Sequence, residues 1–88
     1  MEFRWNDWNI DHIAEHGISP EEAEGVIRNA KRPYPRDIGN GKFIAWGRGS
    51  GGRYLQAIFI TDEDGTGYVI HARTLSEREK RLFRRNQR

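Results

Sequence analysis

The pattern of side chains changes near residue 42, and this change restricts the chain to a mixed fold. Residues before it form short helical patterns that are bounded by helix-capping residues. After it come runs rich in aromatic and β-branched side chains, separated by turns that contain glycine. Such blocks of strands with helices packed on an antiparallel sheet are typical of α+β proteins. The sequence therefore predicts an α+β fold.

The length and composition favour a small domain with a thin core. At 88 residues we expect a single domain, residues 1–88. The chain contains no cysteine, so we expect neither a disulfide framework nor a thiolate zinc site, and no cofactor. No basic segment followed by an apolar run opens the chain, and no apolar stretch is long enough for a membrane span. We therefore expect a cytoplasmic protein that does not enter the membrane.

Two helices are predicted in the N-terminal part. Residues 3–5 resemble a short strand, and Asn6 or Asp7 can cap the helix that follows it. Gly17 suits the left-handed position that ends this helix. The strongest local signal is Ser19-Pro20-Glu21-Glu22, which has the hydroxyl cap, first-turn proline and glutamate of a capping box. The second helix is predicted to bury Ala23, Val26 and Ile27 and to stop before the turn-rich segment 31–41.

Three strands and a last helix are predicted after this turn-rich segment. Residues 42–48 and 53–61 indicate a β-hairpin with a glycine-rich loop, and residues 67–73 indicate the next strand. Ser76 with Glu79 forms another capping box, which opens a basic C-terminal helix. We therefore expect an antiparallel sheet of three to four strands with two N-terminal helices and one C-terminal helix.

Charge is distributed unevenly, although the net charge is only +2. Residues 1–25 carry one Arg against seven acidic residues, a balance of −6, whereas residues 26–88 carry 14 Lys and Arg against six acidic residues, a balance of +8. The stretch 76–88 alone has six cations. A basic region of this kind favours RNA, DNA or an acidic protein as partner. The alternative is a solvated surface that binds nothing.

The third predicted strand carries a candidate catalytic site. Alternation of side chains assigns Tyr68, Ile70 and Ala72 to the core and Val69, His71 and Arg73 to the open face. His71 and Arg73, about 7 Å apart, can supply proton transfer and positive charge for the cleavage of RNA. The alternative is a hydrogen-bonded surface histidine beside a solvated arginine.

Arg48 and Arg53 flank the glycine loop 49–52. Backbone N–H groups of the loop and the two guanidinium groups can hold a phosphate. The two arginines can equally be the polar ends of strands. Nucleoside triphosphate binding is not expected of this loop, because it lacks the Gly-Lys-Ser/Thr of a P-loop and lies inside a hairpin.

The segment His12-Ile13-Ala14-Glu15-His16 matches the zinc motif H-x-x-E-H. A catalytic zinc also needs a third protein ligand and a cleft, which a chain of this size can hardly form, so we expect no metal. Among the aromatic residues, which can be core or can stack on bases, we expect Trp5 and Phe59 to be buried. Strand parity does not decide the face of Trp46.

Several short pieces of sequence together resemble one protein family. They are Phe3-Arg4-Trp5-Asn6, Glu15-His16-Gly17-Ile18-Ser19 with Glu22-Ala23, Phe43-Ile44-Ala45-Trp46-Gly47, Ile70-His71-Ala72-Arg73, and Glu79 with Phe83. In this order they cover nearly the whole chain and resemble the BrnT family of bacterial toxin ribonucleases. The resemblance implies a RelE-like fold, metal-independent endoribonuclease activity that inhibits translation and growth, and a cognate DNA-binding antitoxin that silences the toxin in a type II toxin–antitoxin system.

The resemblance also implies roles for single residues. We assign Lys42, Arg53 and Arg73 to the phosphate and the transition-state charge. His71 or Glu79 would then carry the proton transfers. The further cations expected to bind RNA are Arg48, Lys80, Arg81, Arg84 and Arg85. The chain departs from the family at Glu15, Tyr68, His71 and Phe83, where the family has a lysine, an arginine, a serine and a tyrosine.

Two other functions are compatible with the sequence. One is a non-catalytic basic module that binds nucleic acid or an acidic partner. The other is a structural subunit of a repressor complex, in which this domain mainly carries a DNA-binding antitoxin. The resemblance implies a homodimer or a heterotetramer with the antitoxin, and contact with DNA only through the antitoxin.

Overall fold

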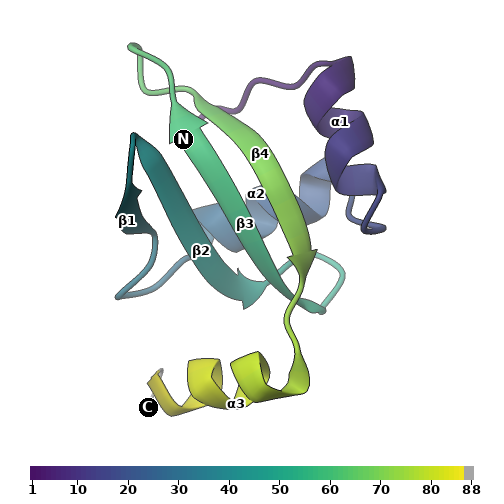
Figure 1. Ribbon diagram of the computed structural model, residues 1–88, viewed down its shortest axis with the longest axis vertical. Helices are drawn as coiled ribbons and strands as arrows, with labels where there is room; N and C mark the ends of the chain where they lie inside the picture. Colours follow the sequence, from purple (N-terminus) through teal and green to yellow (C-terminus); the bar gives the residue numbers. More distant parts are fainter. Residues whose placement is uncertain (87–88) are drawn as a thin grey trace.

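The computed structural model describes residues 1–86, in which one four-stranded sheet is surrounded by three helices (Figure 1). In chain order the elements are α1 (Asp7–Ala14), α2 (Pro20–Arg28), β1 (Arg36–Gly39), β2 (Lys42–Arg48), β3 (Tyr54–Thr61), β4 (Gly67–Thr74) and α3 (Glu77–Asn86). The strands lie in the order β1-β2-β3-β4, and each neighbouring pair is antiparallel. The predicted α+β fold with an antiparallel sheet is confirmed.

The helices are distributed unevenly around the sheet. Figure 1 shows α2 behind β2 and β3, α1 beside the edge strand β4, and α3 beyond the ends of the strands. The face of the sheet turned toward the viewer has no helix of the described chain over it. Across residues 1–86, no helix combines the length and the apolar composition needed to cross a membrane.

Helix α1 begins and ends where its polar and glycine residues predict. Asn6 is the cap: its Oδ1 accepts the N–H of Asn9 at 3.1 Å, and Asn9 Oδ1 accepts the N–H of Asn6 at 2.8 Å. Beyond the helix, Gly17 has a φ of 71°. The N–H of Ile18 donates to the carbonyl of Ile13 at 3.2 Å, which closes a Schellman turn around Gly17. The choice left open between Asn6 and Asp7 is therefore decided for Asn6.

The capping boxes predicted for the other two helices are both present. The Ser19 hydroxyl accepts the N–H of Glu22 at 3.2 Å, and the Glu22 carboxylate accepts the N–H of Ser19 at 3.3 Å. Ser76 and Glu79 repeat this exchange at 3.1 and 2.8 Å. Each cap satisfies backbone N–H groups that have no partner inside the helix, and such caps contribute about 1 kcal/mol each.

The core lies between the sheet and helices α1 and α2. Ala45, Ala57 and Ala72 face one another across three strands and are completely buried, so the helices can approach the sheet closely. The largest fully buried side chains around this row are Phe59, Ile13, Leu55, Val26, Val69 and Asn9. Burying an aliphatic or aromatic side chain of this size contributes about 1.5 to 3 kcal/mol. The core residues predicted on α2, namely Ala23, Val26 and Ile27, are confirmed.

Two expectations about aromatic and N-terminal residues need correction. Phe59 is buried as predicted, but Trp5 is only partly buried, because its Nε1–H reaches outward to Glu24 Oε2 at 2.7 Å. Residues 3–5 do not form a strand. Only Phe3 pairs with the sheet, in a single parallel bridge to Gly67 at the start of β4.

A β-bulge corrects the predicted faces of β4. Ile58 is opposite His71 and Phe59 is opposite Val69, so Ile70 is an extra residue in the ladder. The extra residue shifts the alternation, so that Val69 as well as Ala72 is fully buried. Tyr68 and Ile70, which simple alternation assigned to the core, remain partly exposed. The prediction for Tyr68, Ile70 and Val69 was therefore wrong, because a regular period of two cannot anticipate a bulge.

Strand β1 forms inside the segment that the sequence identified only as turn-rich. It is short and fully exposed, and it pairs with residues 42–44 at the start of β2. Within residues 1–86, no strand pairs with the second half of β2 on that side, so this part of β2 is a free strand edge.

Candidate functional site

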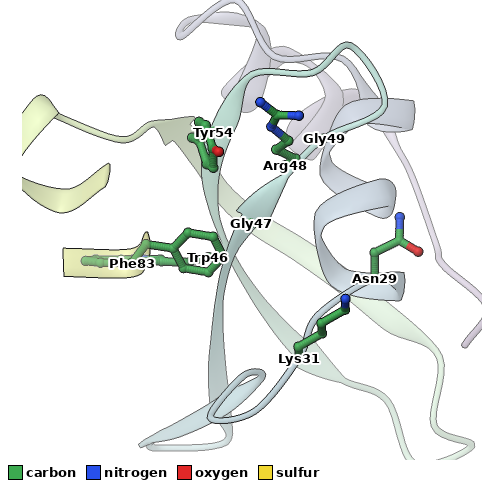
Figure 2. Close-up of a pocket in the computed structure, with 8 residues that line it drawn as sticks. All are labelled: Asn29, Lys31, Trp46, Gly47, Arg48, Gly49, Tyr54 and Phe83. Atoms are coloured by element: carbon green, nitrogen blue, oxygen red, sulfur yellow. The ribbon is translucent and has the colours of Figure 1, made fainter. Parts of the chain in front are cut away.

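An open pocket lies along this free edge of β2, with a volume of about 560 Å³. Its walls come from the end of α2 and the residues after it, from β2 and the following loop, from β3, and from α3 (Figure 2). The lining residues are Asn29, Lys31, Trp46, Gly47, Arg48, Gly49, Tyr54 and Phe83. The short length of β1 creates the space, because a longer strand would occupy it.

One part of the wall is aromatic and consists of three partly exposed side chains, Trp46, Tyr54 and Phe83. Trp46 donates from Nε1 to Gln56 Oε1 at 2.9 Å and stacks on Tyr34 with ring centroids 5.9 Å apart. The ring centroid of Phe83 on α3 lies 6.2 Å from that of Tyr34 and 6.0 Å from that of Tyr54. Figure 2 shows Trp46 and Phe83 on the same side of β2. Since hydrogen bonding and ring contacts hold the indole in place, the pocket offers a fixed aromatic surface to a planar ligand.

Three cations at the pocket have no carboxylate partner in the described part of the chain, residues 1–86. The guanidinium carbon of Arg48 lies 4.9 Å from the ring centroid of Tyr54, and that of Arg84 lies 5.5 Å from the same centroid. Lys31 lines the side formed by the chain after α2. Within residues 1–86, none of these three side chains forms an ion pair. Their positive charge is therefore available to an anion.

A polar network connects the pocket to β4 and α3. Gln56 Oε1 accepts a hydrogen bond from Trp46 and a second one from Arg73 at 3.2 Å. Arg73 also donates to both carboxylate oxygens of Glu79, at 2.7 and 2.8 Å. The Arg73 guanidinium, followed by the N–H of Ser76, lowers the pKa of Glu79 to about 2. At neutral pH, Glu79 is therefore a carboxylate whose charge Arg73 already neutralises.

Arg53, predicted to bind phosphate, lies in a different environment. Its guanidinium donates to Glu22 at 2.8 and 3.0 Å and to the carbonyl of Gly17 at 2.8 Å. The Arg53 guanidinium also lowers the pKa of Glu22 below its usual value. The loop beside it packs on α2, since a Cβ at Gly49 would approach the backbone oxygen of Glu22 to 3.1 Å. These contacts fix the loop on the helix.

His71 packs against α1 and does not stand on an open surface. Its ring centroid lies 5.6 Å from that of His16 and 6.4 Å from that of His12. Burial, and then the nearby charges of His16, Arg73 and His12, lower the pKa of His71. In the part of the chain that the structure describes, no group of His, Asp and Glu residues is placed to hold a metal ion. Lys42 lies at the far end of β2 from the pocket, opposite Ile60.

The structure thus brings together only part of the predicted site. Arg48 lines the pocket, Arg84 reaches its Tyr54 wall, and Arg73 and Glu79 join it through Gln56. Lys80 forms an ion pair with Glu77, and Arg81 and Arg85 are exposed on α3. The residues predicted to be part of the catalytic set that lie away from the pocket are Lys42, Arg53 and His71.

Sequence reasoning missed several pocket residues. Asn29, Lys31 and Tyr54 were not selected, because nothing in the sequence shows that β1 stops short of them. Tyr54 could have been found from the hairpin register, since it is directly opposite Arg48. No family model, curated protein or solved structure matches the chain.

Proposed function

We propose that this protein binds single-stranded RNA, with a base in the pocket and neighbouring phosphates on its unpaired cations. The observation that carries the proposal is the combination of partly exposed aromatic rings with Lys31, Arg48 and Arg84, which have no carboxylate partner within residues 1–86. Aromatic stacking on bases and cations along the backbone are the two main contributions to single-strand binding.

The shape of the site favours a single strand over a duplex. A base must leave its stack to enter a pocket lined by Trp46 and Phe83, which a paired base does only at a cost. The backbone groups of β2 beyond its pairing with β1 can form hydrogen bonds with the edge of such a base. The basic helix α3 extends the positive surface beyond the pocket.

A second candidate function is the one that the BrnT resemblance implies, a ribonuclease toxin acting in the cytoplasm and silenced by an antitoxin. The Arg73–Glu79 pair favours it, because the pair is connected to the pocket through Gln56 and holds a guanidinium and a carboxylate together. Arg73 would stabilise charge on the phosphorane, and Glu79 or His71 would move protons. The non-catalytic module differs only in lacking this step.

The binding proposal is tested with a pair of matched double variants. Arg48→Ala/Arg84→Ala removes two cations at the pocket. Arg78→Ala/Arg85→Ala removes two cations from α3 about 140 to 160° around the helix axis from Phe83. Fluorescence anisotropy with a labelled RNA of about 12 nucleotides should show a loss of affinity of at least about tenfold for the first variant and under about threefold for the second. Equal losses would mean that the pocket has no special role.

Cleavage is tested separately by induced expression in bacteria. Wild type should stop growth and degrade cellular RNA, whereas a folded His71→Ala/Arg73→Ala variant should do neither. A wild type that binds the labelled RNA but leaves growth and cellular RNA intact would reject the toxin function and favour the binding module.

A further inference from the structure

Three isoleucine side chains form an apolar patch on the uncovered face of the sheet. Ile44 of β2 and Ile58 of β3 are directly opposite each other, and Ile60 is two residues further along β3. All three are partly exposed. None belongs to the buried core or to the partly buried side chains that pack against it. We call these three residues the isoleucine patch.

Strand alternation shows which face the isoleucine patch occupies. Its neighbours in the chain, Ala45, Ala57 and Phe59, are at most 1% exposed and point to helices α1 and α2. The isoleucine side chains therefore point away from these helices. Figure 1 shows this opposite face, turned toward the viewer, without a described helix over it.

An isoleucine cluster is unusual on the solvent side of an antiparallel sheet. Such sheets normally alternate apolar residues inside with polar residues outside. β-branched residues favour strands, but threonine would serve equally well and would remain compatible with water. Large exposed apolar patches with a polar rim mark binding surfaces, and these three partly exposed isoleucines are neighbours on one face.

Two cations lie beside the isoleucine patch on its β1 and β2 side. Arg36 of β1 is opposite Ile44, and Lys42 of β2 is opposite Ile60. Strands β2, β3 and β4 contain no Asp or Glu at all. A partner that covers the patch must therefore combine an apolar stripe with acidic residues beside it.

We infer that the isoleucine patch binds an acidic amphipathic helix of a partner protein. The four strands span about 14 Å from β1 to β4, and β2 is about 20 Å long. A helix of three turns is about 16 Å long and about 10 Å wide, so it fits on this area. Its apolar stripe would cover the isoleucines, and its glutamates or aspartates would reach Arg36 and Lys42.

Other occupants fit this surface less well. RNA gains its contacts by base stacking on aromatic rings and by phosphate binding, and aliphatic side chains provide neither. A second copy packed face to face would bring the Arg36 and Lys42 cations of both chains to one interface, where like charges oppose association. The inference does not rest on the proposed RNA binding, because the patch residues do not line the pocket.

The test uses the full chain with labelled isoleucine methyl groups and three synthetic peptides. Each peptide has about 14 residues: leucines at a helical spacing with glutamates elsewhere, the same peptide with lysines in place of the glutamates, and a scrambled glutamate peptide. The acidic amphipathic peptide should shift the NMR signals of Ile44, Ile58 and Ile60 and not those of the buried residues Ile13 and Ile18. Its affinity should exceed that of each control peptide by at least about tenfold.

Variants of the full chain locate the interaction. Ile44→Thr/Ile58→Thr retains β-branched side chains and should lower the affinity at least about tenfold. Ile10→Thr, at an exposed isoleucine on α1, is the matched control and should have no effect. Equal binding of all three peptides, no binding, or shifts outside the patch would overturn the inference.

The labelled RNA separates this inference from the proposed function. Ile44→Thr/Ile58→Thr should bind RNA like wild type, and Arg48→Ala/Arg84→Ala should bind the acidic peptide like wild type. If Ile44→Thr/Ile58→Thr lost RNA binding but retained peptide binding, the isoleucine patch would not be the surface that binds the acidic peptide. A wild type that binds the peptide but not RNA would reject the proposed function alone.

Discussion

Two aromatic clusters at different places on the sheet differ in one decisive respect. In the pocket, Trp46 and Tyr54 lie beside cations that have no carboxylate partner among residues 1–86. At the α1–β4 contact, Trp8 stacks on Tyr68 with ring centroids 6.4 Å apart, and Arg4 lies 4.1 Å above the same tyrosine ring. Arg4 is also bound to Asp62 at 3.0 and 3.2 Å. An aromatic ring beside an arginine therefore does not by itself indicate a nucleic-acid site.

The charge around each cluster strengthens the difference. Helix α1 carries Asp7 and Asp11, and residues 1–25 have a balance of −6. A phosphate near Trp8 would meet this negative charge, even though the indole is 55% exposed. Near Trp46 the charge is positive, and a hollow of about 560 Å³ is available. The comparison teaches that the combination of unpaired cations and a cavity identifies the candidate site.

The largest expected effect is on RNA affinity. Trp46→Ala should raise the Kd for the labelled single-stranded RNA about 10- to 100-fold, because it removes a stacking surface. Trp8→Ala should change the Kd less than about twofold, although Trp8 is the more exposed of the two side chains. Fluorescence anisotropy measures both. If Trp8→Ala lowers the affinity as much as Trp46→Ala, the distinction between the clusters fails.

Trp46→Phe controls for the structural role of the indole. Trp46→Phe keeps an aromatic face for stacking, although it loses the hydrogen bond to Gln56. It should therefore retain most of the RNA affinity that Trp46→Ala loses. Thermal unfolding of all three variants shows whether each is folded under the conditions of the binding measurement.

Local signals explain how much of the fold was predictable. Capping boxes at Ser19 and Ser76 and the left-handed glycine at 17 act over a few residues, and a sequence displays them directly. The hairpin of β2 and β3 was also correctly predicted from its glycine loop. The bulge at Ile70 and the short strand β1 were not, since both depend on pairing with a neighbouring strand.

The candidate site was predicted less well than the fold for the same physical reason. Arg48 and Arg84 were identified from their charge, which composition reveals. Whether these arginines can bind an anion depends on whether a carboxylate contacts them. That contact is decided by the folded arrangement of the chain and not by the sequence near each arginine. Arg53 looked equivalent to Arg48 in the sequence, yet the fold places it on Glu22.

The second prediction compares the ion pairs of the two clusters. Glu79→Gln should lower the free energy of unfolding by about 1 to 2 kcal/mol, because it breaks a two-point contact with Arg73 that also caps α3. Asp62→Asn breaks the more exposed pair with Arg4 and should cost less than Glu79→Gln, because water screens this pair. Urea unfolding measures both, and equal costs would show that the network behind the pocket has no special stability.

The Glu79 carboxylate also makes the free energy of unfolding depend on pH in the acidic range. The folded-state pKa of Glu79 is lowered to about 2, so its contribution to stability is complete above the ordinary carboxyl range and is lost as the pH falls from about 4.5 toward 2. In Glu79→Gln, this part of the loss should be absent. Unfolding curves recorded over that range decide the point.

The smallest effect is expected at the α1–β4 contact, where all three histidines of the chain lie near one another. The pKa of His71 is lowered in the folded protein by burial and then by the charges of His16, Arg73 and His12. The unfolded chain therefore takes up a proton first as the pH falls below about 6.5, and stability decreases from there toward the folded-state pKa.

His71→Gln should abolish this decrease, which we expect to stay under about 1 kcal/mol because the ring is partly exposed and water screens the charges. Thermal unfolding of wild type and variant between about pH 7 and 5 measures it, above the range in which Glu79 titrates. His71 lies 6.4 Å from the ring of His12, which stacks on Trp8, so the change of charge on His71 should shift the indole N–H signal of Trp8 over this range, whereas that of Trp46 should not shift. Parallel unfolding curves for the two proteins would show that His71 does not couple the α1–β4 contact to pH. If only the indole N–H signal of Trp46 shifted, the pocket and not the α1–β4 contact would respond to pH. The two aromatic clusters would then differ in the opposite way from the one proposed.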